Sequence, residues 1–267
     1  MKIKCSFYSL KNLSDLSNGE NLLKILFQNN LEIKNANDRE PINIVFDIDN
    51  FPKIWLMENQ VVPALSQTFL FKGSKEISFK GMAIWIKNLH SNSKEFGGIS
   101  IWLNVKKGYD IDKIVKLGDD LFTWSEAVYG YISEDSYSPS YGFNKNHLEK
   151  CKYPEYVRRR NGRESKNGKI YTSRGNLYQG LYDPMWISYF GIPYLQEVDF
   201  RLPENRLTIG HGSRIKLTEK PNDEILCEPD YLAEIKRNIG DEWFWQNPKI
   251  SELKLPFFDR NEITRNE

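Results

Sequence analysis

Two carboxylates, Asp47 and Asp49, directly follow an apolar run in the segment Phe46-Asp47-Ile48-Asp49-Asn50. Acidic side chains one residue apart at a strand end can hold Mg²⁺, and one of them can accept a phosphoryl group. Such an enzyme needs a second acidic pair, and Gly118-Asp119-Asp120 is a poor match because it falls inside a predicted helix. Short motifs arise easily by chance, so we expect Asp47 and Asp49 to be solvated and keep Mg²⁺-dependent phosphotransfer as the less favoured alternative.

The histidines and cysteines show no pattern of a metal site or a nucleophile. The only histidines are His90, His147 and His211. None has a second ligand at a metal-binding spacing, and His211, between two glycines, is typical of a turn. The cysteines are Cys5, Cys151 and Cys227, too far apart for a Cys-x-x-Cys pair. Neither a Gly-x-Ser-x-Gly elbow nor a glycine-rich phosphate loop occurs. We therefore expect a protein that is not an enzyme and needs no cofactor or metal.

A basic and aromatic segment stands out near the middle of the chain. Arg158, Arg159 and Arg160 lie at its centre, after Tyr153 and Tyr156. Such a segment can bind phosphates and stack on bases, contact an acidic protein, or be a solvated loop. Lys+Arg 37 against Asp+Glu 36 leaves a net charge of +1, so no global field attracts a polyanion. We rank a loop first, a protein partner second and nucleic acid third, and these five residues are our partner-binding candidates.

Composition points to a globular protein of the cytoplasm. Hydrophobic residues make up 40% and charged residues 27% of the 267 residues, unlike a disordered chain. No stretch of about 18 apolar residues occurs, and the first residues lack the apolar run of a signal peptide, so we expect neither a membrane span nor a cleaved signal. Few cysteines suit a reducing compartment.

Periodicity predicts a mixture of strands and helices. Alternation at Ile3, Cys5 and Phe7 predicts a first strand, residues 22–27 a helix ending at Asn29-Asn30, and residues 42–48 a strand. Residues 80–89 and 97–108 predict an antiparallel hairpin, in which Trp85 and Trp102 are expected to be aromatic cross-strand partners.

The second half predicts two further helices and a second hairpin. A helix from Asp110 to Trp124 has Asp110 as its N-cap, and Gly118 allows an end or a kink. Residues 185–190 predict a compact helix or turn, residues 207–217 a hairpin, and residues 231–239 a helix between Pro229 and Gly240. We expect one α+β domain over residues 1–267, with a mainly antiparallel sheet and a loop-rich insertion at about 133–180.

The C-terminal half resembles a known family. Residues 183–195, Asp-Pro-Met-Trp-Ile-Ser-Tyr-Phe-Gly-Ile-Pro-Tyr-Leu, are similar to the Trp, Tyr/Phe-Phe-Gly, Pro-Tyr signature of the type VI immunity family and the related immunity protein 52 family. A hairpin, a Thr-Glu-x-Pro step at residues 218–221 and a helix running to Trp243-Phe244-Trp245 follow, as in that family. The aromatic residues of the signature are expected to pack in a core.

This resemblance implies a bacterial immunity protein whose partner is a cognate protein toxin, bound and blocked by occlusion. It implies no membrane partner, and self-association stays open. A phage-defence or anti-defence factor would act through protein binding in the same way and is kept as an alternative.

Overall fold

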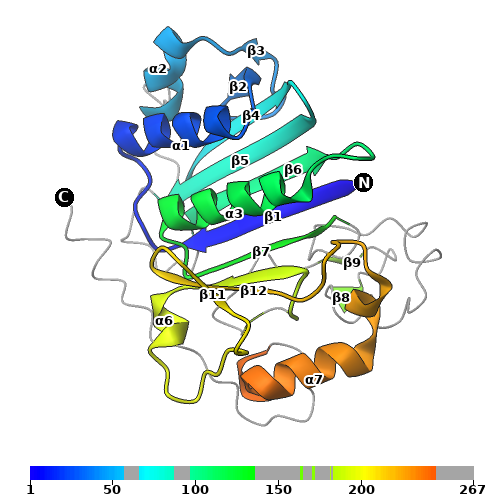
Figure 1. Ribbon diagram of the computed structural model, residues 1–267. Helices are drawn as coiled ribbons and strands as arrows, with labels where there is room; N and C mark the ends of the chain where they lie inside the picture. Colours follow the sequence, from blue (N-terminus) through cyan, green and yellow to red (C-terminus); the bar gives the residue numbers. More distant parts are fainter. Residues whose placement is uncertain are drawn as a thin grey trace.

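A ten-stranded antiparallel sheet organises the chain (Figure 1). The computed structural model describes residues 1–56, 66–86, 97–135, 163–164, 170–171, 181 and 183–244. The sheet order is β11-β12-β10-β7-β1-β6-β5-β4-β2-β3, so the first strand lies at its centre between β6 and β7. The N-terminal half of the chain therefore builds one side of the sheet, and the segment after β7 builds the other.

The strands of this sheet are β1 (Lys2–Ser9), β2 (Ile33–Asn37), β3 (Ile44–Val45), β4 (Ser66–Ser74), β5 (Ser78–Ile86), β6 (Gly97–Asn104), β7 (Tyr129–Glu134), β10 (Ile187–Phe190), β11 (Leu207–Ile209) and β12 (Gly212–Lys216). A separate short pair consists of β8 (Arg163–Glu164) and β9 (Ile170–Tyr171). The helices are α1 (Leu16–Gln28), α2 (Phe51–Leu56), α3 (Ile111–Ser125), α6 (Ile192–Leu195) and α7 (Pro229–Ile239), with single turns η1 (Ile48–Asn50), η3 (Glu224–Cys227) and η4 (Asp241–Trp243). This mixture is the α+β fold that the periodicity predicts.

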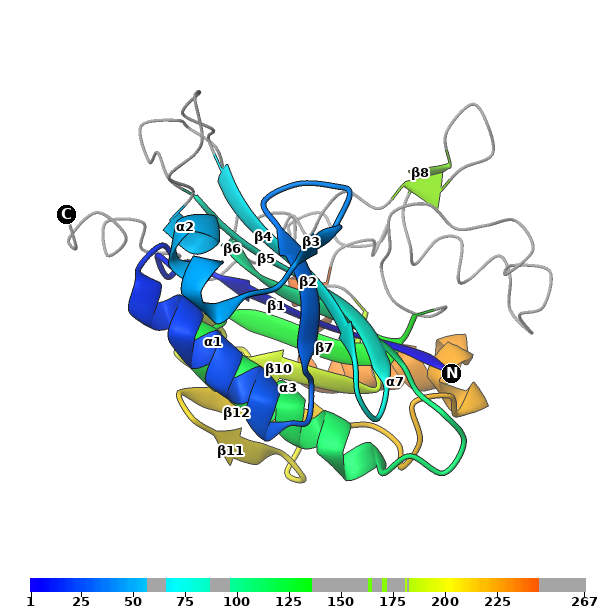
Figure 2. The same cartoon turned by 90° about the horizontal axis from the view of Figure 1, so that it is seen from above.

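Two cores lie on opposite faces of the sheet. Figure 2 shows α1 and α3 along one face, where they cover the inward residues Ile3, Cys5 and Phe7 of β1. On the other face α7 and the segment after α6 pack against β7, β10 and β12 around Tyr129 and Tyr131. Both cores bury many aromatic rings, which is why the chain is so rich in them.

Helix α3 forms where the sequence predicts it. The Asp110 carboxylate accepts a hydrogen bond from the Asp112 amide at 3.0 Å and caps the helix. The helix does not end at Gly118 but runs on to Ser125, and the missing side chain lets α3 lie close against the sheet. A Cβ there would stand 2.5 Å from Ile132 Cδ1 and 2.6 Å from the Tyr189 hydroxyl.

Three local expectations are wrong. Residues 187–190 form strand β10 instead of a helix or turn, because a fully buried strand and a buried helical turn look alike in an apolar run. In the 42–48 segment only Ile44–Val45 is a strand, and η1 follows it. Trp85 and Trp102 are not partners: the register places Trp102 opposite Lys80, so the two indoles lie on opposite faces.

No helix within the described residues is both long and apolar enough to cross a membrane.

Candidate functional site

Asp47 and Asp49 shape a turn. Asp47 Oδ1 accepts from the Asp49 amide at 3.1 Å, and its Oδ2 accepts from the Asn50 side-chain amide at 3.3 Å. Both carboxylates are exposed. The described part of the chain brings together no group of three or more His, Cys, Asp or Glu side chains able to hold a metal. It thus supplies no third carboxylate for the phosphotransfer hypothesis.

Asp119 and Asp120 belong to two different contacts of α3 (Ile111–Ser125). Asp119 accepts from the Tyr189 hydroxyl at 2.9 Å and from Arg214 Nη1 at 2.6 Å, which ties the helix to β10 and β12. Burial raises the pKa of Asp119, while the Arg214 charge and the hydrogen bonds act against that rise. Asp120 instead pairs with Lys116 at 2.6 Å on the exposed side. These carboxylates anchor a helix.

His211 is a turn residue, as its two flanking glycines predict. Its ring stacks on Phe122 with centroids 4.6 Å apart, and Nε2 lies 2.9 Å from the Ala127 carbonyl. Gly210 supplies the positive φ of +55° that the turn requires.

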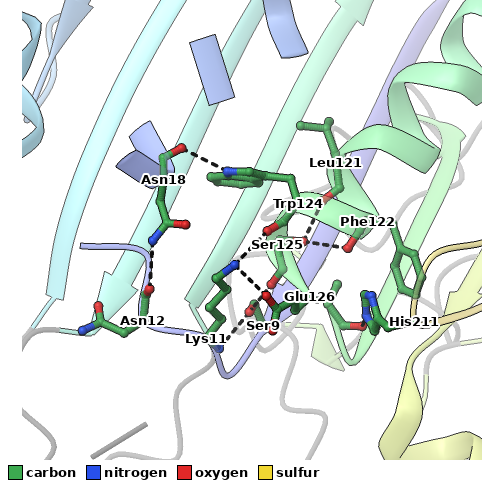
Figure 3. Close-up of polar contacts among 11 residues, drawn as sticks. Ser9, Lys11, Asn12, Asn18, Leu121, Phe122, Trp124, Ser125, Glu126 and His211 are labelled. Carbon is green, nitrogen blue, oxygen red and sulfur yellow. Dashed lines mark hydrogen bonds and ion pairs between the residues drawn. The ribbon is translucent and has the colours of Figure 1, made fainter. Parts of the chain in front are cut away.

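The end of β1 is fastened to the C-terminus of α3 beside this histidine (Figure 3). The Ser9 hydroxyl donates to the Ser125 carbonyl, and the Ser125 hydroxyl donates to the Leu121 carbonyl at 2.7 Å. Lys11 Nζ lies 2.7 Å from Glu126, the residue that ends α3 with a φ of 47°. Both hydroxyls are committed to backbone carbonyls of the last two turns of α3, so this network has a structural role.

The partner-binding candidates Arg158, Arg159, Arg160, Tyr153 and Tyr156 all lie outside the described residues. Their assignment stays a prediction.

A different basic surface emerges from the sheet. Residues of β1, β4, β5 and β6 alternate between the face covered by α1 and α3 and the opposite face, which we call the lysine face. The side chains that the register directs there are Lys2, Lys4, Ser6 and Tyr8 of β1; Thr68, Leu70, Lys72 and Ser74 of β4; Ser78, Lys80, Met82 and Ile84 of β5; and Ser100, Trp102 and Asn104 of β6. None of these side chains is acidic.

Three lysines of this face fall in one row across the sheet, which we call the lysine row. Lys72 pairs in register with Lys80, Lys80 with Trp102, and Trp102 with Lys4. Lys72 and Lys80 are exposed and Trp102 is half-buried. The row therefore presents cations and an indole to solvent at its outer end.

Lys4 lies at the inner end of the row. Its Nζ lies 5.4 Å from the centre of the Trp102 ring and 5.8 Å from that of Tyr131, distances at which aromatic faces attract a cation. Burial lowers the pKa of Lys4, and the nearby Tyr8 and Asp135 act in the opposite direction. The rings thus stabilise a charge that the protein has partly removed from water.

One acidic side chain reaches the outer end of the row from a loop. The Glu40 carboxylate accepts a hydrogen bond from Lys80 Nζ, and both side chains remain more than half exposed. That hydrogen bond lowers the pKa of Glu40, and the charges of Lys80 and Lys72 add to the effect. Glu40 thereby shows where a carboxylate binds Lys80 within the electrostatic influence of Lys72.

The sequence contains a signal for this face that its interpretation missed. Lys2 and Lys4 alternate with Ile3 and Cys5, which is typical of a strand with one basic face. Lys72 and Lys80 each sit beside buried phenylalanines in the same way. Only the strand order brings these lysines together.

Comparison with known proteins finds a solved structure with a similar fold. No protein-family model and no curated protein sequence matches the chain. Among solved structures, the chain is similar to the T6SS protein PA0821 of Pseudomonas aeruginosa, with a TM-score of 0.50 and 10% sequence identity. The match covers 89% of this chain and 75% of the Pseudomonas protein. The two proteins share an α+β architecture.

Proposed function

We propose that this chain is a type VI secretion-associated immunity protein, which binds a protein toxin and blocks it without catalysis. The observation that carries the proposal is the fold similarity to a T6SS protein over 89% of the chain. Fold alone does not imply function, so the immunity role rests in addition on the C-terminal signature.

The parts of that signature contact one another in the folded chain. Trp186 Nε1 donates to the Thr218 carbonyl at 2.8 Å, which joins the signature tryptophan to the Thr-Glu-x-Pro step. The Tyr231 hydroxyl donates to the Leu217 carbonyl at 3.1 Å, which joins the closing helix to the hairpin. Segments that are separate in sequence therefore form one structural unit. This supports the view that the resemblance to the immunity family reflects a similar fold and is not a chance similarity of sequence.

The signature aromatics are core residues, as expected. Trp186, Tyr189, Phe190 and Tyr194 are each no more than 1% exposed. They stabilise the fold and leave binding to the surface. Stoichiometric occlusion of a toxin requires an interface of about 800 Å² per partner with a few aromatic or basic anchors.

Co-expression tests the proposal. The gene is expressed in bacteria together with a candidate toxin gene taken from its genome neighbourhood, and growth and complex formation on gel filtration are measured. We expect growth to be rescued and the two proteins to co-elute. As a control, a variant with Tyr194→Asp, which places a charge in the core, should lose the rescue together with its folded structure. Growth arrest with the folded wild-type protein present, and no complex, would contradict the proposal.

A further inference from the structure

The lysine row lowers the stability of the sheet, because it places like charges side by side. Lys72 and Lys80 lie directly opposite each other on neighbouring strands, at a spacing of about 4.8 Å between the strands. Like charges in that position destabilise a sheet. No acidic side chain of the four strands faces them, and the carboxylate that offsets their charge is that of Glu40, which comes from a loop and is itself exposed. An anionic group from outside would remove the repulsion.

Glu40 shows how such a group would be held. Its carboxylate is exposed, comes from the β2–β3 connection, and sits on Lys80 within the field of Lys72. A contact between exposed side chains stabilises a protein only slightly, so an incoming carboxylate can displace it. Glu40 thus occupies the place that a partner's acid would take.

We infer that the lysine row is a docking surface for an acidic segment of a protein partner. A carboxylate of the partner replaces Glu40 on Lys80 and Lys72, and an apolar side chain next to it packs on Trp102. The inference rests on the proposed function in taking the toxin as that partner. It adds the surface and the chemistry of the contact.

The neighbouring residues favour protein over nucleic acid. Met82 and Ile84, the next two residues of β5 on the same face, are half-buried and apolar. Aromatic and Met side chains beside a basic rim are typical of protein interfaces, whereas nucleic-acid surfaces are far more positive overall. The net charge of +1 also gives the chain no general attraction for polyanions.

A peptide-binding experiment tests the surface without the toxin. The probe is a fluorescein-labelled peptide of alternating glutamate and leucine, and its binding to the full chain is followed by fluorescence anisotropy. The variant Lys72→Glu/Lys80→Glu should bind about tenfold more weakly than wild type. The matched control Lys24→Glu/Lys53→Glu makes the same charge change at exposed positions of α1 and α2 and should bind like wild type. Equal weakening in both variants, or no binding to wild type, overturns the inference.

Glu40→Gln gives a prediction of the opposite sign. Removal of the competing carboxylate should tighten peptide binding several-fold, and the gain should vanish in about 1 M salt, where the Debye length is about 3 Å. Unchanged or weaker binding would mean that the partner's acid does not take the place of Glu40. Should the double Glu variant fail to fold, Lys72→Gln/Lys80→Gln removes the charges without adding acids, and its binding decides.

Two further measurements separate the alternatives. A single-stranded DNA oligonucleotide that binds through Lys72 and Lys80 better than the peptide does would assign the surface to nucleic acid and overturn the inference. If the Lys72→Glu/Lys80→Glu variant neutralises the toxin as well as the wild type in the co-expression assay, the docking surface is refuted while the proposed function stands. If the peptide binds through the lysines but the protein rescues no growth, the proposed function is refuted and the docking surface stands.

Discussion

The pair between Arg214 and Asp119 should stabilise the fold measurably. Its N–O distance is 2.6 Å, and the side chains are only 11% and 23% exposed. Breaking a fully buried pair costs about 3–5 kcal/mol, whereas an exposed pair is worth about 1 kcal/mol or less. The partial burial places Arg214→Gln between these limits. We expect it to lower the free energy of unfolding by about 2 kcal/mol near neutral pH.

The loss should depend on pH with a defined sign. Burial raises the pKa of Asp119 above the ordinary aspartate value of 3.8, and Arg214 limits that rise. Because the folded state then binds a proton more readily than the unfolded state, acidification through the window above 3.8 stabilises the fold, and stability falls as pH rises through it. Without Arg214 the pKa of Asp119 rises further, and the pH range over which stability falls becomes wider. The penalty of Arg214→Gln should therefore shrink from about pH 7 to about pH 4.5.

Urea unfolding at both pH values measures the effect. The matched control is Lys116→Gln, which breaks the neighbouring pair with Asp120 at the same distance of 2.6 Å but with 60% and 29% exposure. That variant should lose less than about 0.5 kcal/mol. Equal losses in the two variants, or a loss in Arg214→Gln that does not change with pH, would refute the reasoning from burial.

Three other predictions concern a close contact, a thiol and the basic segment. The variant Gly118→Ala gains about 1 kcal/mol of helix propensity but forces a Cβ against Ile132 and Tyr189. Thermal unfolding should therefore show that the free energy of unfolding falls by about 1 kcal/mol, and a more stable variant would contradict the close packing. Burial raises the pKa of the Cys5 thiol to about 12, so in a Cys151→Ser/Cys227→Ser variant a thiol reagent should react only after unfolding; rapid reaction of the folded protein would contradict this. If the arginines at positions 158–160 bind the partner, replacing all three with Ala should slow association and weaken its dependence on salt in stopped-flow measurements, while thermal stability stays unchanged. Equal association rates and equal salt dependence in the variant and the wild type would make these arginines solvated loop residues.

Elements with strong local signals were predictable from the sequence. Alternation at Ile3, Cys5 and Phe7 matches β1, and the Asp110 cap matches the start of α3. Helix α7 runs from Pro229 to Ile239 and Gly240 follows it, as the flanking Pro and Gly predict. In each case the periodicity and the end signal belong to neighbouring residues, so no distant contact is needed.

Elements stabilised by distant partners were not predictable. Strand β2 has the polar sequence Ile-Lys-Asn-Ala-Asn, and it is a strand because β4 and β3 pair with it on both sides. Residues 187–190 form a strand because β7 and β12 flank them. Gly118 lies inside α3, and its missing Cβ leaves room for the Tyr189 hydroxyl, a close approach that the sequence does not reveal.

The sequence by itself determined the α+β class, the ends of α3 and α7 and the burial of the signature aromatics, because side-chain periodicity and capping are local properties. It missed the start of α1, which begins at Leu16 and not at residue 22. It also determined that Lys4, Lys72 and Lys80 each lie next to a buried residue on a strand. Only the tertiary structure decided that these lysines share one face. Lys4 and Lys72 belong to strands separated by β6 and β5, and strand order and register follow from the burial of both cores. Pairing between distant strands depends on this collective packing, which no single segment encodes.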